Sequence, residues 1–338
     1  MHNKINKLLW IFVFFLLIFL ALFILYNEKS DNLKAYEKRF YYMDSYIYIK
    51  LYTNTEEKAG DAFDKINLIY KKYHELADRN NGYPGLKNIY YIKNNNEENE
   101  YLEIDYKLYE ILELGLLCNK KTNELFDIKL GNLTDVWFNY KNRLISKPTI
   151  DQIDKINIEE VVLKDGSILN NHPNIDLNGF IKGYTNNIVK NYLYSIGIDK
   201  FIINAGGNIL VGKHYGDGKY IIGIEDPTKN DLSIFLKVLA VEKTIVTKGN
   251  YDSNMHDGDK TYINIVNPKT KILSDNFLSV TVISPNPIEA DVISNILPLM
   301  KLEEALEFVE SKKDVEAIFY ISDDEQVMSS GFKEYLNK

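Results

Sequence analysis

Apolar residues at helical spacing predict amphipathic helices that pack against a sheet. In residues 55–76 the apolar positions fall on one helix face, at Ala59, Phe63, Ile66, Ile69 and Tyr73. The same spacing predicts helices over residues 105–119, about 180–196, 288–297 and 302–309, and a mostly polar helix over 151–160.

Short runs that alternate, or that are apolar throughout, predict strands between these helices. They cover residues 41–52, 200–204, 209–211, 220–225, 234–246, 261–266, 278–284 and 315–321. A hairpin is expected over residues 161–169, around Asp165 and Gly166, and a turn at residues 247–251. Gly206 and Gly207 separate two apolar segments and indicate either a bulge or a backbone surface that faces a ligand.

The first part of the chain predicts a membrane anchor. Residues 8–26 form an uninterrupted apolar run of 19 residues, which as a helix just spans a hydrocarbon core of roughly 30 Å. Lys4 and Lys7 precede the run, so residues 1–7 are expected in the cytoplasm. No small-residue cleavage site follows, which favours an uncleaved anchor over a signal peptide. We therefore expect a transmembrane helix, a tether over residues 27–40 and one extracytoplasmic domain over residues 41–338.

Composition and charge exclude several classes of function. The chain has 338 residues, 45% of them hydrophobic, and a formal net charge of −8 without a basic stripe, so no nucleic-acid partner is expected. The single cysteine, Cys118, excludes an intrachain disulfide and a cysteine metal cluster. The five histidines show no zinc-binding spacing.

Residues 175–185, with the sequence IDLNGFIKGYT, are typical of a strand end, a glycine turn and the first turn of a helix. Asp176 is the expected N-cap of that helix. Gly179 and Gly183 allow a ligand to approach the backbone, and Lys182 adds a cation beside a helix N-terminus that favours anions. The pattern suits a phosphate ester, although ordinary turn chemistry explains it equally well in isolation.

Two other stretches carry groups suited to chemistry. Residues 125–137 place two carboxylates, a glycine and Trp137 close together, which predicts either a pocket wall or a loop with a core tryptophan. Asp291 and Asn295 are four residues apart on a predicted helix and therefore share a face. Their oxygens can hold a hard cation such as Mg²⁺, or they can form an ordinary exposed pair.

Six short motifs follow one another along the chain: residues 43–45 (MDS), 126–137 (FDIKLGNLTDVW), 176–184 (DLNGFIKGY), 204–208 (NAGGN), 264–270 (NIVNPKT), and 279–282 (SVTV) with 290–291 (AD). In order and approximate spacing they resemble the motifs of the ApbE family, the FAD:protein FMN transferases. The resemblance covers residues 41 to about 332.

The resemblance implies an α+β fold of the T-fold type, with mixed or antiparallel sheets and packed helices. It implies FAD as a substrate, Mg²⁺ as a cofactor, and transfer of FMN to a threonine or serine hydroxyl of a partner protein with release of AMP. The usual partners of the family are extracytoplasmic flavoprotein subunits of membrane redox systems, which agrees with the expected anchor.

The resemblance also implies roles for particular residues. Asp291 and Lys182 are the expected catalytic residues, and Mg²⁺ is expected on Asp291, the side chain of Asn295 and the backbone carbonyl of Ile181. The expected nucleotide and flavin site comprises Met43, Leu125, Phe126, Asp127, Asn178, Lys182, Gly206, Gly207 and Ile265.

Several positions depart from the family pattern. Asn264 and Asn267 replace a histidine and an aspartate, Asn178 and Lys271 replace glycines, and Asn295 replaces a metal-binding threonine. The family's T-S-G-x-Y-x-R is Thr247-Lys248-Gly249-Asn250-Tyr251-Asp252-Ser253 here. Ser253 therefore replaces an arginine, whose charge Lys248 restores only in part.

These departures leave alternatives open. Because Asn264 cannot act as a general base, the chain can also be a flavin-binding relative that no longer transfers. Hydrolysis of FAD to FMN and AMP is a variant on the same site. A usual acceptor of the family ends its motif in Gly-Ala-Ser or Gly-Ala-Thr. The stretch Asp165-Gly166-Ser167-Ile168-Leu169 of this chain lacks that ending, so self-flavinylation is not expected.

Overall fold

An antiparallel sheet of eight strands forms the centre of the protein. The computed structural model describes residues 16, 18–19, 33–229, 233–249, 256–257, 260–322 and 325–337. The strand order is β1-β2-β6-β7-β10-β15-β16-β17. The strands are β1 (Lys34–Tyr42), β2 (Ser45–Thr53), β6 (Phe201–Ala205), β7 (Asn208–Val211), β10 (Lys243–Gly249), β15 (Ser279–Ser284), β16 (Glu316–Ser322) and β17 (Glu325–Met328).

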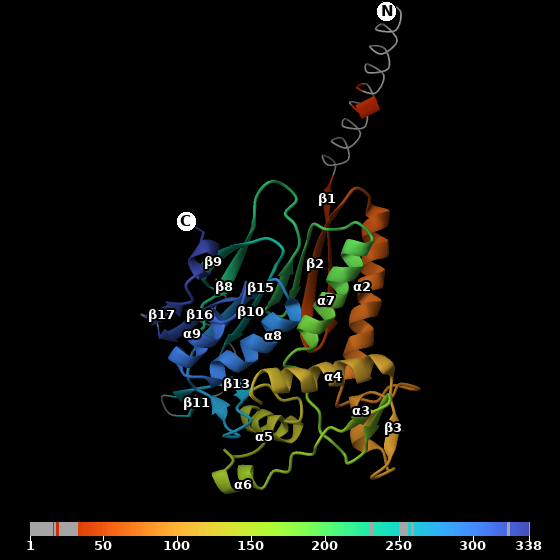
Figure 1. Cartoon of the computed structure of the whole chain (residues 1–338), viewed down its shortest axis with the longest axis vertical. Helices are drawn as coiled ribbons and strands as arrows, with labels where there is room; N and C mark the ends of the chain where they lie inside the picture. The colour runs from red at the N-terminus through yellow and green to blue at the C-terminus, as the bar shows by residue number, and fades with distance from the viewer. Residues whose placement is uncertain are drawn as a thin grey trace, which may run out of the picture.

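Four helices cover one face of this sheet (Figure 1). They are α2 (Glu56–Ala77), α7 (Ile181–Ser195), α8 (Pro287–Ile296) and α9 (Leu302–Glu310). The first two pack on β2 and β6 through a core that includes Ile47, Ile66 and Val189, and the last two pack on β15 and β16 through Ile293 and Phe319. The buried residues of β2, such as Ile47, alternate with partly exposed ones, so their burial fixes the register of the strand. A shift by one residue would expose them.

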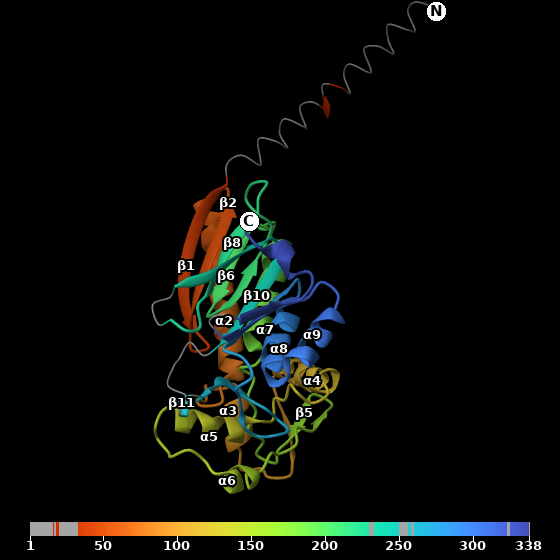
Figure 2. The same ribbon diagram turned by 90° about the vertical axis from the view of Figure 1, so that its left-hand side faces the viewer.

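A hairpin covers part of the opposite face of the sheet (Figure 2). It consists of β8 (Tyr220–Glu225) and β9 (Ile234–Ala240), paired antiparallel. Its buried residues, such as Ile222 and Val238, pack with Ile245 and Ile283 of the sheet. The protein therefore has helices on one face of the sheet and a β-ribbon on the other, which is an α+β arrangement.

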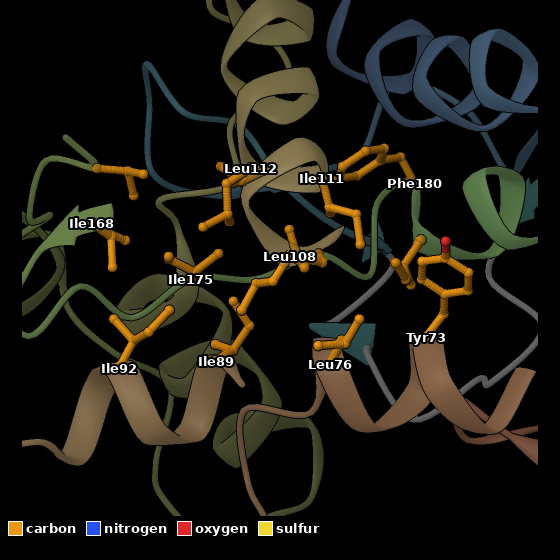
Figure 3. Close-up of a cluster of buried hydrophobic side chains, with 14 of the residues drawn as sticks. Tyr73, Leu76, Ile89, Ile92, Leu108, Ile111, Leu112, Ile168, Ile175 and Phe180 are labelled. Atoms are coloured by element: carbon orange, nitrogen blue, oxygen red, sulfur yellow. The ribbon is translucent and has the colours of Figure 1, made fainter. Parts of the chain in front are cut away.

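Smaller elements gather at one end of the sheet, below α2 and α7 in Figure 1. They are α3 (Ile89–Asn94), α4 (Tyr106–Lys121), α5 (Gly131–Lys141), α6 (Ile150–Asp154) and a three-stranded sheet of β3 (Tyr101–Glu103), β5 (Ser167–Leu169) and β4 (Leu163–Lys164). Figure 3 shows their common core, where Leu76 of α2 and Phe180 before α7 meet side chains of α3 and α4. Because both helices contribute to this core, it holds the start of α7 close to the end of α2.

The remaining elements are short. They are β11 (His256–Asp257), β12 (Lys260–Thr261), β13 (Ile263–Val266), β14 (Leu273–Ser274), and the 3₁₀ helices Leu297–Leu299 and Phe332–Tyr335. The pair β13–β14 lies between the eight-stranded sheet and α5, since Leu273 and Val266 pack with Leu133 and Trp137.

The long helices lie where the apolar spacing predicted them. Thr55 caps α2 by accepting from the Lys58 amide at 3.2 Å, and Asp105 caps α4 by accepting from the Lys107 amide at 2.8 Å. Such caps satisfy amides that the helix itself leaves unpaired.

Several predicted boundaries are wrong. The expected strand 234–246 is two strands, because the chain turns at Val241 and Glu242, and Glu242 has φ 52°. Thr247 to Gly249 extend β10 and are not a turn, since they pair with β15. The helix predicted over 151–160 covers only Ile150–Asp154. The stretch 125–137, predicted as either a pocket wall or a loop with a core tryptophan, enters α5 at Gly131, and its Trp137 is buried.

The N-terminal predictions fall mostly outside the described residues. Of the expected anchor, residues 8–26, only Leu16, Ile18 and Phe19 are described. Within the described part of the chain, no helix has both the length and the apolar character needed to cross a bilayer. The expected tether, residues 27–40, overlaps β1, which begins at Lys34 and pairs with β2 along its whole length.

Candidate active site

The site lies where α7 begins. Helix α7 starts at Ile181, and Phe180 occupies its N-cap position without a side-chain hydrogen bond. The prediction that Asp176 caps this helix is therefore wrong. Asp176 instead accepts from the Asn178 amide at 2.9 Å and shapes the turn that precedes the helix. Lys182 stands in the first turn of α7, as predicted.

Helices α7 and α8 touch at Gly183. A Cβ atom at this position would lie 2.3 Å from the Pro287 carbonyl oxygen and 2.8 Å from the Asp291 Cβ, so only glycine fits. The close approach lets the Gly183 amide donate to Asp291 Oδ2 at 2.9 Å. One turn further along α8, Asn295 Nδ2 donates to the Gly179 carbonyl at 2.7 Å. Two motifs more than a hundred residues apart in sequence thus form one unit.

Asp291 is a buried carboxylate that faces two lysines. Its side chain is 1% exposed, and its Oδ1 accepts no hydrogen bond. The Lys248 ammonium, from the end of β10, lies 3.2 Å from this oxygen. We regard this contact as an ion pair without the direction of a hydrogen bond. Since an isolated buried charge is costly, Lys248 supplies the nearby opposite charge that Asp291 needs.

Lys182 is the second lysine of the site. Its ammonium donates to Ser45 Oγ at 2.6 Å. Burial and, to a smaller extent, the charge of Lys248 lower the pKa of Lys182 to about 8, against the opposite effects of Asp291 and Asp44. The site therefore places two lysines beside one buried carboxylate, and their ammonium groups can also pair with the negative oxygens of a phosphate ligand.

A cavity of about 270 Å³ opens beside this unit, and we call it the first cavity. Its lining brings together Leu125, Phe126, Asp127, Asn178, Ile265 and Asn295, all predicted site residues, with Lys248 and Asn264. Burial raises the pKa of the Asp127 carboxyl, while the Lys129 amide donates to its Oδ1 at 2.9 Å.

A second cavity, of about 280 Å³, lies on the other side of the same turn. Asp176 and Asn178 line both cavities, and the second one also contains Met43 and Ile181 of the predicted site. His74 lines it as well and accepts from the Met43 amide at 3.3 Å through Nδ1.

Gly206 and Gly207 lie in neither of these cavities. They form the two-residue turn between β6 and β7, with φ of 60° and 84°, so the expected bulge is a hairpin turn. They line a third, larger hollow of about 1150 Å³, which we call the open groove. A Cβ at Gly206 would lie 2.5 Å from Ser45 Oγ and 3.3 Å from Lys182 Nζ, so this turn closes over the lysine.

Arg79 is a site residue that the sequence did not reveal. It lines the second cavity and donates to the Gly131 carbonyl at 3.3 Å and to Thr134 Oγ1 at 3.2 Å. It also pairs with Asp135 and lies 3.8 Å from Asp176 Oδ2. Arg79 ties the loop after α2 to α5 and to the turn before α7. A single arginine in a polar loop has no spacing pattern, and His74 on α2 has none either, so neither residue could be found from sequence.

The departures from the family pattern fall mostly around one side of the first cavity. Asn264 is exposed on β13 and lines the cavity. Asn267 accepts from the Lys269 amide at 2.9 Å, a turn contact that aspartate would make equally well. Lys271 adopts φ 59°, a conformation that favours glycine. Ser253 lies outside the described residues.

The residues predicted to hold Mg²⁺ fit a hard cation. Asp291 Oδ1 is a buried oxygen without a hydrogen bond, and Asn295 uses its amide nitrogen for two carbonyls, which leaves the amide oxygen for a ligand. The Ile181 carbonyl accepts from Thr185 Oγ1 at 2.8 Å and is the least available of the three. No group of three or more His, Cys, Asp or Glu side chains gathers as metal ligands in the described part, so a cation here needs further oxygens from a ligand or water.

The fold and these cavities define a class: an antiparallel α+β protein with two lysines and a buried carboxylate beside two adjoining cavities. The profile of the ApbE family matches residues 43–319. The chain belongs to the ApbE family.

Curated relatives and solved structures agree with this membership. A FAD:protein FMN transferase of Buchnera aphidicola subsp. Schizaphis graminum is 27% identical over 314 residues, which cover 87% of each chain. One from Klebsiella pneumoniae is 24% identical over 89% of this chain and 93% of the relative.

Two solved structures show the same fold. The flavin transferase ApbE from Vibrio cholerae superposes with a TM-score of 0.74 at 20% identity, covering 90% of this chain and all of the other. The ApbE protein from Thermotoga maritima gives 0.76 at 20% identity with the same coverage. The α+β prediction is confirmed, and the finer T-fold assignment stays a prediction.

Proposed function

We propose that this protein transfers FMN from FAD to a threonine or serine hydroxyl of a partner protein, in a reaction that requires Mg²⁺. The hydroxyl oxygen attacks the phosphorus of the FMN half of FAD. A P–O bond to the acceptor forms, the P–O bond to the AMP half breaks, AMP leaves with the bridging oxygen, and the hydroxyl proton passes to a base or to water.

One observation carries this proposal. The backbone of Gly179 and Gly183 is hydrogen-bonded to Asn295 and Asp291, which joins the turn at α7 to α8 beside two lysines. The unit stands where the first and second cavities meet. FAD has two ring systems joined by a diphosphate, so two adjoining cavities of about 270 and 280 Å³, with Lys182 and Lys248 nearby, suit its shape and its phosphates.

The protein's own side chains would then act by charge and by position. Lys182 and Lys248 neutralise the diphosphate and the charge that develops on the leaving AMP. Phe126, Asp127 and Ile265 contact one ring system in the first cavity, and Met43 and Arg79 border the other. When bound at Asp291, Asn295 and Ile181, Mg²⁺ supplies further stabilisation of charge on the phosphate oxygens.

The open groove is the proposed path of the acceptor. Ser45 and Gly206, which lie beside Lys182, belong to its lining, and it is several times larger than either cavity. Tyr41 and Tyr46 on its rim are 59% and 73% exposed, with ring centroids 5.2 Å apart, and such aromatic pairs are frequent anchors for protein segments. Tyr46→Ala should raise KM for the acceptor and leave FAD affinity unchanged.

The location of the acceptor follows from the N-terminal run. If residues 8–26 span the membrane, the domain lies outside the cytoplasm and meets flavoprotein subunits of membrane redox systems there. Fusion of alkaline phosphatase to the C-terminus tests this orientation, because the fused enzyme is active only outside the cytoplasm. An inactive but intact fusion would contradict it.

The function is tested with the domain from residue 33 onward, FAD, Mg²⁺ and an acceptor protein that ends its motif in Gly-Ala-Thr. Mass spectrometry should find FMN on the acceptor and an equal amount of AMP. AMP without labelled acceptor would indicate FAD hydrolysis, and bound FAD without AMP would indicate a binding protein; both results would contradict the proposal.

Asp291 provides the matched variants. Asp291→Ala should lower transfer by about 100-fold or more, the size expected when a charge-positioning group is removed from a phosphoryl-transfer site. Asp64→Ala, an equal change at an exposed carboxylate of α2, should leave transfer unchanged. Unchanged turnover in Asp291→Ala would refute the assignment.

A further inference from the structure

Asp291 Oδ1 is the best oxygen in the site for a divalent cation, and it already has a cation beside it. The Lys248 ammonium stands 3.2 Å away, while the other carboxylate oxygen is held by the Gly183 amide. Lys248 is itself only 25% exposed in its side chain. A cation on Oδ1 and the present position of Lys248 therefore exclude each other.

We propose that Lys248 is a built-in substitute for the metal: it occupies the cation position on Asp291 in the nucleotide-free protein, and Mg²⁺ enters only together with the diphosphate. The inference rests on the proposed function for the identity of the metal and the nucleotide. It concerns the order of binding, which the proposed function leaves open.

The charges of the described residues support this order. Lys248 pairs with Asp291 and Lys182 lies nearby, so a divalent ion at Oδ1 would be repelled by two ammonium groups at close range. A diphosphate removes this repulsion, because its negative oxygens attract both lysines. Lys248 can then turn from Asp291 to the phosphates and release Oδ1.

The position of Lys248 makes such a turn possible. The residue lies near the end of β10, where Gly249 follows it, and both residues line the first cavity. Its backbone is fixed by pairing with Val280 in β15, so only the side chain needs to move. By contrast, Lys182 is held by Ser45 and covered by the Gly206 turn. The two lysines thus have different freedom, and only Lys248 contacts the carboxylate.

Position 248 distinguishes this chain from the family motif that it resembles. In the family motif that Thr247, Lys248 and Gly249 match, the middle position is serine. A serine hydroxyl is too short and uncharged to neutralise Asp291 as Lys248 does. We infer that relatives with serine leave this carboxylate open to the metal, whereas this chain closes it until nucleotide arrives.

The test measures metal binding without nucleotide, so it does not depend on transfer. Mg²⁺ is titrated calorimetrically into the wild-type domain, Lys248→Met and Lys248→Ser, and free Mn²⁺ is followed by electron paramagnetic resonance as a second probe. Both variants should bind the metal at least about tenfold more tightly than the wild type, because the competing charge is gone. Lys243→Met, which removes an equal charge at the other end of β10, is the control and should bind like the wild type.

Thermal unfolding provides a readout that a general loss of stability would not mimic. Lys248→Met leaves the Asp291 carboxylate buried without its counter-charge, so the variant should have a lower Tm, and Mg²⁺ alone should restore it. Mg²⁺ alone should change the Tm of the wild type little. Equal or weaker metal binding in both Lys248 variants would overturn the inference, even if FMN transfer were observed.

Discussion

The two walls of the first cavity differ in how strictly they are packed. One wall, which we call the helix wall, is made by the turn before α7, by Phe126 and by α8, and its atoms leave no spare room at Gly183. The other, the strand wall, is made by the end of β10 and by β13, where Lys248 and Asn264 project toward the cavity. Among the described residues, the departures at 248, 264, 267 and 271 lie on or next to the strand wall, whereas those at 178 and 295 lie on the helix wall.

This difference separates positions where the backbone contact is essential from positions where the side chain can change. On the strand wall the backbone is fixed by strand pairing and by turn contacts, so a side chain can change without moving its neighbours. On the helix wall the site depends on the direct contact between α7 and α8, because the Gly183 amide reaches Asp291 only while these helices touch. Substitution of Gly183 would therefore change the fold of the site, whereas substitution of a side chain that only borders the cavity, such as Lys248 or Asn264, changes its chemistry.

The largest expected effect is the loss of the helix wall in Gly183→Ala. The added methyl group would meet the Pro287 carbonyl at 2.3 Å, a backbone atom that cannot turn away. We expect a loss of about 3 kcal/mol in the free energy of unfolding, the upper range for overpacking, together with loss of FMN transfer. Urea unfolding followed by circular dichroism measures the first quantity.

Gly60→Ala is the matched control for this prediction. Gly60 lies in the second turn of α2, and a Cβ there has no neighbour within 4 Å. Alanine should therefore stabilise the protein by up to about 1 kcal/mol through its higher helix propensity. If both variants had the same stability, the helix wall would not be the tightly packed side of the site.

The next smaller effect is expected for Lys182→Met, which should raise the free energy of unfolding where Gly183→Ala lowers it. The pKa of Lys182 is about 8 in the folded protein and 10.5 in the reference state, so the folded protein binds its proton less tightly. This penalty is fully present below pH 8 and disappears as the pH rises toward 10.5, because the unfolded state then loses its proton too. We expect Lys182→Met to be more stable than the wild type by roughly 1–3 kcal/mol at pH 7 and to lose transfer activity.

The pH dependence separates this cause from better packing. The stability difference between Lys182→Met and the wild type should shrink between pH 8 and pH 10.5, as measured by thermal unfolding. Lys65→Met, at an exposed position of α2, should show no such difference. A difference that stayed constant with pH would mean that charge burial is not its source.

The sequence predicted the parts of this site that depend on local pattern. The helix over residues 288–297 follows from its apolar spacing and the N-terminal proline, and with it the common face of Asp291 and Asn295. The turn glycines and Lys182 were recognisable because backbone conformation and charge are local properties. Their placement around one cavity came from the resemblance to the family, since no spacing in the chain shows that α7 and α8 touch.

What the sequence could not predict depends on contacts across the fold. The N-cap prediction for Asp176 failed because its carboxylate turns to the Asn178 amide and the helix starts five residues later, at Ile181. Arg79 and His74 reach the second cavity only because the core beneath α2 fixes their position. The ion pair of Lys248 with Asp291 is a further contact of this kind. The sequence identified Lys248 as a departure from the family and Asp291 as a predicted metal ligand, but it did not show that the two side chains meet.

Asn264→His tests whether the strand wall governs chemistry. Asn264 is exposed toward the first cavity, and histidine at this position can accept a proton near neutral pH. We expect transfer to rise by about tenfold, below the usual range for a fully positioned base. The profile of kcat/KM against pH should gain an inflection near about 6.5. Asn264→Gln should change neither quantity, and a loss of folding stability in either variant would contradict the tolerance of this wall.

Lys271→Gly is the smallest expected effect, and it tests whether the strand wall is held by backbone alone. Lys271 adopts φ 59°, its amide donates to the Asn267 carbonyl at 2.7 Å, and its carbonyl accepts from Trp137 Nε1 at 3.0 Å. Glycine keeps both backbone contacts and relieves the left-handed conformation, so we expect a gain of about 0.5–1 kcal/mol in the free energy of unfolding. Lys269→Gly in the same turn, where φ is not positive, should lose stability. If Lys271→Gly were also destabilised, the contact of the Lys271 ammonium with the Asp154 carbonyl at 3.3 Å would outweigh the backbone, and the strand wall would depend on its side chains as the helix wall does.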